Sequence, residues 1–128
     1  WVVSDRFADS SLAYQGYARG LGPDRVKAVH AAVMNGFKPD LTILFDIDPI
    51  LAQKRVETRG EEMSRFDREG IDFHNTLREA FLDIANDNAE RFFTLDAGGS
   101  RDAIHNRIVH ALSTRYPELA GKLSSSES

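Results

Sequence analysis

The sequence predicts an α/β fold, with a parallel β-sheet covered by helices on both faces. Three short segments, residues 1–4, 41–47 and 91–95, carry apolar side chains at consecutive positions, as do strands buried on both faces. The stretches between them have helical periodicity. Strands that alternate with helices form parallel β-α-β units, which is the basis of this prediction.

The first two predicted helices have recognisable start and stop signals. Ser10 or Ser11 can cap the first helix, and Gly20 can end it. Pro23 suits the first turn of the second helix, and Gly36 lies just beyond its end. The apolar face of the second helix is made by Val26, Val29 and Val33.

Three further helices are predicted in the second half of the chain. Asp48 and Pro49 open a helix that ends near residue 59, and a longer helix covers residues 67–86. Ser100 caps the last one. The longer helix has an apolar stripe of Phe73, Leu77, Phe81 and Ile84. The last helix turns Ile104, Ile108 and Leu112 inward.

The composition indicates one small soluble domain. We assign residues 1–116 to it and expect residues 117–128 to be a disordered tail. The net charge of -4, from 16 basic and 20 acidic residues, argues against a nucleic-acid or membrane-surface binder, but allows a small anionic ligand. No apolar run is long enough for a membrane span.

The content of cysteine and histidine argues against a metal site built from thiolate or imidazole ligands. The sequence has no cysteine, which excludes disulfides and thiolate metal ligands and fits a reducing cytoplasm. The four histidines show no metal-ligand spacing. We therefore assign no metal ligand in this chain.

An aspartate ends each predicted strand, and these strand ends mark the candidate site. They are Asp5, Asp46 with Asp48, and Asp96. Parallel sheets bind ligands at the carboxyl ends of their strands, so the residues beside these aspartates are the functional candidates.

The first candidates are Asp5 and Arg6 after the first strand. An arginine there can present its planar fork to a phosphate, although an Asp–Arg surface pair is the commoner explanation. The first helix adds Tyr14, with a flat ring face, and Gln15, with a donor and an acceptor for a ring edge. Considered alone, it also fits a capped helix with a half-buried tyrosine.

Two further segments could contact a ligand, one through basic side chains that meet phosphates and the other through its backbone. A basic run spans a polar break between helices; it could close over phosphates or be a solvated loop. Its members are Lys54, Arg55, Arg59, Arg65 and Arg68. Two glycines in residues 97–100 would allow close backbone approach to a ligand, and a tight turn is an equal alternative.

Taken in this order, the segments resemble the thymidylate kinase family of P-loop enzymes over residues 1–115. No single segment is decisive, but the combination is specific. The residues that carry the resemblance are Asp5-Arg6-Phe7, Ser10 to Gly16, Arg19-Gly20-Leu21, Pro39 to Thr42, Phe45 to Pro49, Arg55, Arg59, Ser64 to Asp67 and Phe73-His74.

The resemblance implies a P-loop-type kinase fold, dTMP and ATP as substrates, Mg²⁺, and a homodimer. Arg6 resembles the arginine that grips the dTMP phosphate, with Asp5 beside the reaction centre. Tyr14 corresponds to the residue that packs on the deoxyribose. Ser11 and Gln15 correspond to residues that meet the thymine, and Ser10 beside them is also taken as a dTMP-binding residue. On the ATP side, the resemblance implies lid arginines Arg55, Arg59 and Arg65, in a lid at about residues 59–67, and the adenine loop Ala97, Gly98, Gly99 and Ser100.

Two departures qualify this resemblance, one in the lid residues and one in the absence of the family's amino-terminal portion. Ser64 and Asp67 stand where the family usually has Asp and Glu, and Arg68 offers a second lid register with poorer spacing to Phe73. No Gly-x-x-x-x-Gly-Lys-Ser/Thr loop occurs. The chain also begins inside an apolar run without Met, so we expect a truncated kinase that is inactive alone and exposes apolar edges at Val2, Val3 and Leu44. The alternatives are a related deoxynucleoside kinase and a non-catalytic nucleotide-binding module.

Overall fold

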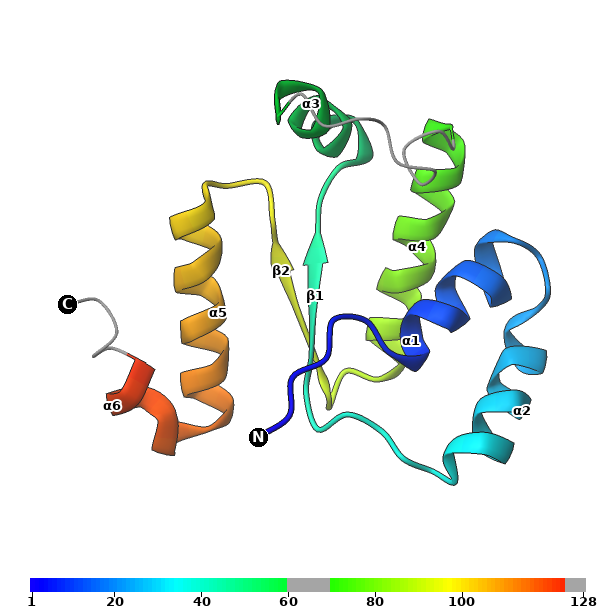
Figure 1. The fold of residues 1–128 in the computed structure, drawn as a ribbon, viewed down its shortest axis with the longest axis horizontal. Coiled ribbons are helices and arrows are strands. Elements are labelled where there is room, and N and C mark those ends of the chain that lie inside the picture. Colours follow the sequence, from blue (N-terminus) through cyan, green and yellow to red (C-terminus); the bar gives the residue numbers. More distant parts are fainter. Residues whose placement is uncertain (60–69, 124–128) are drawn as a thin grey trace.

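The computed structural model describes residues 1–59 and 70–123, and in this part it is an α/β structure built on two parallel strands (Figure 1). Strand β1, Thr42–Asp46, pairs with β2, Phe92–Asp96, in a register that sets Thr42 opposite Phe92 and Asp46 opposite Asp96. The parallel α/β class and the strands expected at residues 41–47 and 91–95 are confirmed.

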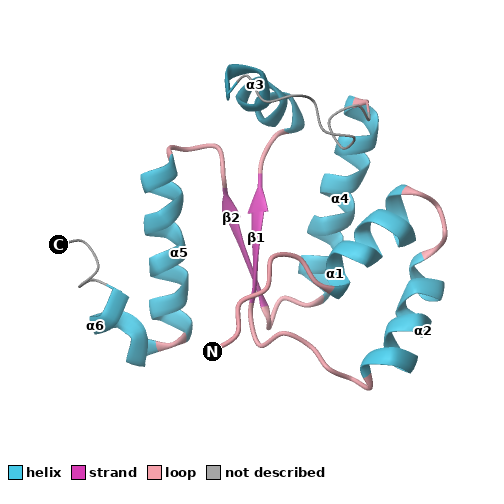
Figure 2. Ribbon diagram, viewed as in Figure 1, coloured by secondary structure: helices cyan, strands magenta, loops and turns pink. Residues whose placement is uncertain are grey.

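Helices cover the sheet from two sides, as the fold class requires (Figures 1 and 2). Helix α4, Ile71–Asp87, lies beside β1, and helix α5, Arg101–Arg115, lies beside β2 on the opposite side. Helix α3, Pro49–Arg59, follows β1 at the carboxyl ends of the strands. The helices predicted to open at Asp48-Pro49 and after Ser100 are confirmed. Among the described residues, no helix combines the length and apolarity needed to cross a membrane.

The first helical segment begins earlier than the sequence indicated. Helix α1, Ala8–Ser11, runs directly into a π-helical stretch η1, Leu12–Ala18, and Phe7 occupies the capping position. The prediction that Ser10 or Ser11 caps this helix is therefore wrong, because both serines already lie within it. Gly20 ends the segment as predicted, with a left-handed φ of 76° that glycine adopts without strain.

Residues 1–4, predicted as a strand, form none. Val2 and Val3 are 96% and 94% exposed, and Trp1 packs edge-on against Tyr116 at a centroid separation of 4.9 Å. An extended segment becomes a strand only when a neighbour satisfies its backbone groups, and the described sheet contains only β1 and β2. Val2 and Val3 are thus exposed as expected, whereas Leu44 is half-buried.

The end of the chain also differs from the prediction. Residues 117–123 form a 3₁₀ turn, Pro117–Leu119, and a short helix α6, Ala120–Leu123, so the expected disordered tail is wrong for them. Both elements contact α5. Residues 124–128 lie outside the described part.

The main apolar core lies around η1, which packs against α4 and against helix α2, Pro23–Met34. Its buried members are Leu12, Ala13, Val26, Leu77, Ala80 and Ile84. The predicted stripe of α4 is confirmed, since Phe73 and Phe81 pack against this core beside Leu77 and Ile84. The predicted apolar face of α2 is only partly buried, because Val29 and Val33 are 60% and 77% exposed.

An ion pair between Asp9 and Arg91 fastens α1 to the start of β2. The guanidinium donates two hydrogen bonds to the Asp9 carboxylate, at 2.8 and 2.9 Å, and a third to the Thr42 hydroxyl at 3.3 Å. Only 12% of the Arg91 side chain and 15% of the Asp9 side chain are exposed. The hydrogen bond to Asp9 is the main cause of the raised pKa of Arg91, which stays charged. The pair joins segments 82 positions apart.

Replacing Arg91 with Met should lower the free energy of unfolding by about 3 kcal/mol, because the Asp9 carboxylate then remains buried without its partner. Combining Arg91→Met with Asp9→Leu should recover much of this loss, since no charge is left behind. Urea unfolding measures both. Arg101→Met, on an exposed position, is the matched control and should change stability by less than about 0.5 kcal/mol. An Arg91 variant as stable as this control would contradict the anchoring role.

Candidate functional site

A cavity of about 580 Å³ opens at the carboxyl end of β1. Its wall comes from η1, β1, α3 and α4, and most of its lining is apolar. The charged or hydrogen-bonding side chains among the lining residues are Arg6, Tyr14, Asp46, Gln53, Glu57, His74 and Arg78. A largely apolar pocket with a few polar groups is the usual form of a small-molecule site.

Arg6 reaches this cavity from an unusual backbone conformation. Its φ is 62°, in the left-handed region that side chains other than glycine rarely adopt. The Ser4 hydroxyl donates a hydrogen bond of 3.0 Å to the Arg6 carbonyl oxygen. Backbone strain of this kind concentrates at functional sites, so the conformation supports the choice of Arg6 as a site residue.

Tyr14 lies beside Arg6 on the π-helical stretch η1. The Arg6 guanidinium carbon is 5.5 Å from the centre of the Tyr14 ring, within the range of a cation–π contact. The ring also meets Phe81 in an edge-to-face arrangement, with centroids 6.3 Å apart. Burial raises the pKa of the Tyr14 phenol, and the charges of Arg6 and Arg19 oppose that rise. The structure thus brings together two predicted site residues, and the phenol is neutral at pH 7.

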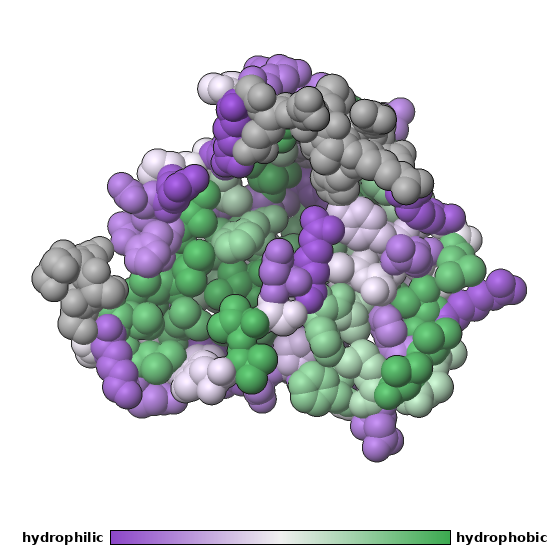
Figure 3. Space-filling model, in the orientation of Figure 1, coloured by the Kyte–Doolittle hydropathy of each residue, from purple (hydrophilic) through white to green (hydrophobic). Residues whose placement is uncertain are grey.

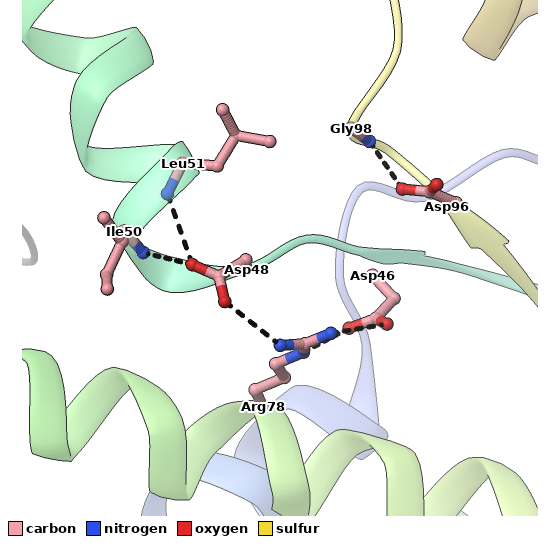
Figure 4. Close-up of polar contacts among 7 residues, drawn as sticks. All are labelled: Asp46, Asp48, Ile50, Leu51, Arg78, Asp96 and Gly98. Carbon is pink, nitrogen blue, oxygen red and sulfur yellow. Dashed lines mark hydrogen bonds and ion pairs between the residues drawn. The ribbon is translucent and has the colours of Figure 1, made fainter.

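Arg78 on α4 is a site residue that the sequence analysis missed (Figure 4). Its guanidinium donates two hydrogen bonds to the Asp46 carboxylate, at 2.8 and 3.1 Å, and lies 3.8 Å from the Asp48 carboxylate. The hydrogen bond to Asp46 is the main cause of the raised pKa of Arg78. The sequence did contain a signal for Arg78. It directly follows Leu77, a member of the apolar stripe of α4, so it is a charged residue beside the helix face that packs inward.

Asp48 also caps the helix that follows β1. Its Oδ1 accepts hydrogen bonds from the backbone N–H groups of Ile50, at 2.9 Å, and Leu51, at 3.4 Å (Figure 4). These bonds satisfy amide groups in the first turn of α3 that have no partner within the helix. Asp48 therefore shapes the entry to α3 in addition to its contact with Arg78.

The loop after β2 is the second predicted segment at this edge of the sheet. Ala97 N–H donates to the Asp46 carbonyl oxygen at 2.8 Å, and Gly98 N–H donates to the Asp96 carboxylate at 2.7 Å. A Cβ on Gly98 would lie 2.9 Å from that carboxylate oxygen, so a larger residue there would require the Asp96 side chain to shift. Ser100 then caps α5 by accepting a hydrogen bond from Ala103 N–H at 3.1 Å, as predicted.

Arg55 on α3 points into this loop. It donates one hydrogen bond to the Ala97 carbonyl oxygen and one to the Gly99 carbonyl oxygen, both at 2.7 Å. The sequence identified Arg55 and residues 97–100 as separate pieces of one binding region, and the structure places them in contact.

The other predicted site residues lie apart from the cavity lining. Ser11 and Gln15 are exposed, and Ser10 is half-buried. Asp5 and Arg59 are exposed. Arg65, Arg68 and most of the predicted lid lie outside the described residues. Among the described residues, no group of three or more His, Cys, Asp or Glu side chains could hold a metal ion.

Comparison with known proteins agrees with this arrangement. The sequence matches the thymidylate kinase family over residues 1–108, most of the chain. The chain belongs to the thymidylate kinase family. This membership confirms the resemblance and the P-loop-type fold class that it implied.

Individual relatives give the same family. The chain is 44% identical to the thymidylate kinase of Chromohalobacter salexigens over 115 residues, which is 90% of this chain and 54% of that protein. It is 41% identical to the thymidylate kinase of Geobacillus sp. WCH70 over 112 residues, 87% of this chain and 53% of that protein. The thymidylate kinase of Deinococcus radiodurans is 41% identical over 114 residues, 89% of this chain and 55% of its own. The chain thus spans about half the length of the curated relatives it matches.

Gly16 sets how closely η1, which carries Tyr14, can approach α2. A Cβ at Gly16 would lie 3.2 Å from the Pro23 Cα and 3.2 Å from the Leu12 Cδ1. We expect Gly16→Ala to destabilise the chain by about 1–3 kcal/mol, because the Pro23 backbone must move away. Gly121→Ala is the control, because that glycine is also helical and, among the described residues, no atom outside its own helix backbone and chain neighbours lies within 4 Å of the added Cβ. Urea unfolding measures the free energy of unfolding of both variants. Equal values for the two would contradict the close contact at Gly16.

Proposed function

We propose that this protein phosphorylates dTMP to dTDP with ATP, a step in dTTP synthesis. The observation that carries the proposal is the pairing of Arg6 with Tyr14 in a cavity at the carboxyl end of β1, in a chain of the thymidylate kinase family. An arginine fork suits a phosphate, and an aromatic ring beside it suits a sugar or base.

On the dTMP side, we assign Arg6 to the phosphate and Tyr14 to the face of the deoxyribose. A half-buried, neutral ring in this place would crowd a ribose 2′-hydroxyl. We assign Ser11 and Gln15 to the thymine and Ser10 to the dTMP site in general. All three lie on the same helical segment as Tyr14. Asp5 precedes Arg6 and is assigned to the neighbourhood of the reaction centre.

On the ATP side, we assign the adenine to the loop of residues 97–100 and the phosphates to the lid arginines. Arg59 ends α3, where the predicted lid begins, and Arg65 belongs to that lid. Mg²⁺ is part of the proposal, because it neutralises charge on transferring phosphates. Asp46 and Asp48 already contact Arg78, and Asp96 binds the Gly98 amide, so we assign no magnesium ligand to these three.

The proposed mechanism is in-line transfer of the γ-phosphoryl group to the dTMP phosphate. Such reactions depend on the positions of the groups and on charge neutralisation, and they need no covalent intermediate. Arg6 holds the accepting phosphate and neutralises part of its charge. Most of the cavity lining beside Arg6 is apolar, and a charge–charge contact is stronger beside apolar surface than in open water.

We also propose a homodimer in the cytoplasm. Apolar side chains gather on parts of the face seen in Figure 3. On α2 and just beyond its end, Val29, Val33 and Phe37 are 60%, 77% and 65% exposed. Apolar surface of this kind marks interaction sites. A chain without cysteine has no disulfide that would need an oxidising compartment.

A coupled ADP-release assay with ATP and dTMP tests the proposal. It is run on the product of the complete gene and on the 128-residue chain, which has no glycine-rich phosphate loop and is expected to be inactive. Turnover by the complete product with dTMP supports the proposal. Turnover with thymidine instead would indicate a deoxynucleoside kinase, and no turnover with either would indicate a binding module.

Arg6→Ala in the complete gene product should reduce kcat/KM for dTMP by roughly 10- to 100-fold, because a charge-assisted contact to phosphate is worth about 1.5–3 kcal/mol. Arg6→Lys should recover only part of this, since an ammonium group cannot reproduce the two-pronged contact. Steady-state kinetics measure both. Arg25→Ala removes an exposed arginine from α2 and should leave the kinetics unchanged. Unchanged kinetics for Arg6→Ala would rule out its assigned role.

Tyr14→Ala should relax the preference for dTMP over its ribose counterpart, because the ring that crowds the 2′-hydroxyl is removed. The ratio of kcat/KM for the two nucleotides measures this. Tyr14→Phe is the matched control, since it keeps the ring and should keep the ratio. If Tyr14→Ala leaves the ratio unchanged, Tyr14 is a packing residue and does not select the sugar.

A further inference from the structure

We propose that Arg55 is a positioning residue, which holds the loop after β2 in the shape that meets the base of ATP. The inference rests on the proposed function for the identity of the ligand. It assigns Arg55 a different task from the direct contact with ATP that the family resemblance implied.

The argument starts from the hydrogen bonds of the Arg55 guanidinium. Its two terminal nitrogens donate to two carbonyl oxygens of one loop, those of Ala97 and Gly99, at 2.7 Å each. The Arg55 side chain is half-buried, and both bonds are partly buried. Hydrogen bonds from a charged donor are stronger than those from a neutral donor. These two bonds therefore hold the Arg55 guanidinium against the loop.

The loop is shaped from its other sides as well. Asp46 of β1 holds the Ala97 N–H, and the Asp96 side chain holds the Gly98 N–H. Arg107 of α5 donates to the Asp96 carbonyl oxygen. The partners in these bonds belong to the sheet, the loop or α5. Arg55 adds a link from α3, which binds the carbonyl groups of Ala97 and Gly99.

A fixed backbone is what a base-binding loop requires, because backbone N–H and C=O groups can recognise a ring edge only when their directions are fixed. Leu51, one turn before Arg55 on α3, lies beside the loop, 3.6 Å from the place of a Gly98 Cβ. Helix α3 therefore contacts this loop with two side chains, the apolar Leu51 and the guanidinium of Arg55. The geometry couples the helix that leads into the predicted lid to the loop that borders the base.

The test uses Arg55→Lys and Arg55→Gln in the complete gene product, with Arg25→Gln as a control that also removes one arginine. Calorimetric titration gives the Kd of ATP and of adenosine, which has no phosphate. Because a lysine cannot donate to both carbonyl groups in parallel, we expect both Kd values to rise by the same factor, about 10-fold. The KM for dTMP should not change. A weaker binding of ATP with unchanged adenosine binding would mean that Arg55 contacts the phosphates, and would overturn the inference.

Amide hydrogen exchange provides a readout that needs no nucleotide. Exchange at Ala97 and Gly98 should become about 10-fold faster in Arg55→Gln, because the loop opens locally more often. Unchanged exchange would overturn the inference even if ATP binding falls. If the wild-type protein does not phosphorylate dTMP, the proposed function is wrong. The adenosine titration and the exchange rates then still decide whether Arg55 positions a base-binding loop.

Discussion

The parallel pairing of β1 with β2 determines which segments leave the sheet at the edge where the candidate site lies. The register sets Asp46 directly opposite Asp96, so the two strands end side by side and both following segments leave at the same edge. Helix α3 and the loop before α5 therefore start as neighbours, although 50 positions separate the two aspartates in the sequence. Parallel strands impose this arrangement because all their carboxyl ends meet at one edge of the sheet.

Arginines then fix the elements that the sheet brings together. Arg78 joins α4 to the end of β1 through Asp46, and Arg55 joins α3 to the loop after β2. At the opposite end of the sheet, Arg91 fastens α1 to the start of β2 through Asp9. A guanidinium suits this task because its planar fork makes two bonds in a fixed geometry, which sets orientation as well as distance. The chain thus uses several of its arginines to place the segments that are assigned to substrates.

The sequence revealed the secondary structure wherever a local signal existed. Asp48, Ser100 and Pro23 mark helix starts, and Gly20 marks a helix end, because capping and left-handed turns depend on a few adjacent residues. Its errors have physical causes. Residues 1–4 have strand composition, but a strand also needs a hydrogen-bonding neighbour. Ser10 and Ser11 have capping side chains, but a helix that already begins at Ala8 includes them.

By itself, then, the sequence determined the parallel α/β class, the two strands and the family. It also identified Arg6, Tyr14 and residues 97–100 as candidate site residues. Only the tertiary structure decided which of these meet. It placed Arg6 over Tyr14, turned Arg55 towards two loop carbonyl groups and brought Arg78 to Asp46. These contacts join residues that are up to 44 positions apart. No local pattern encodes them, because they depend on the register of the strands and on the packing of helices across the sheet.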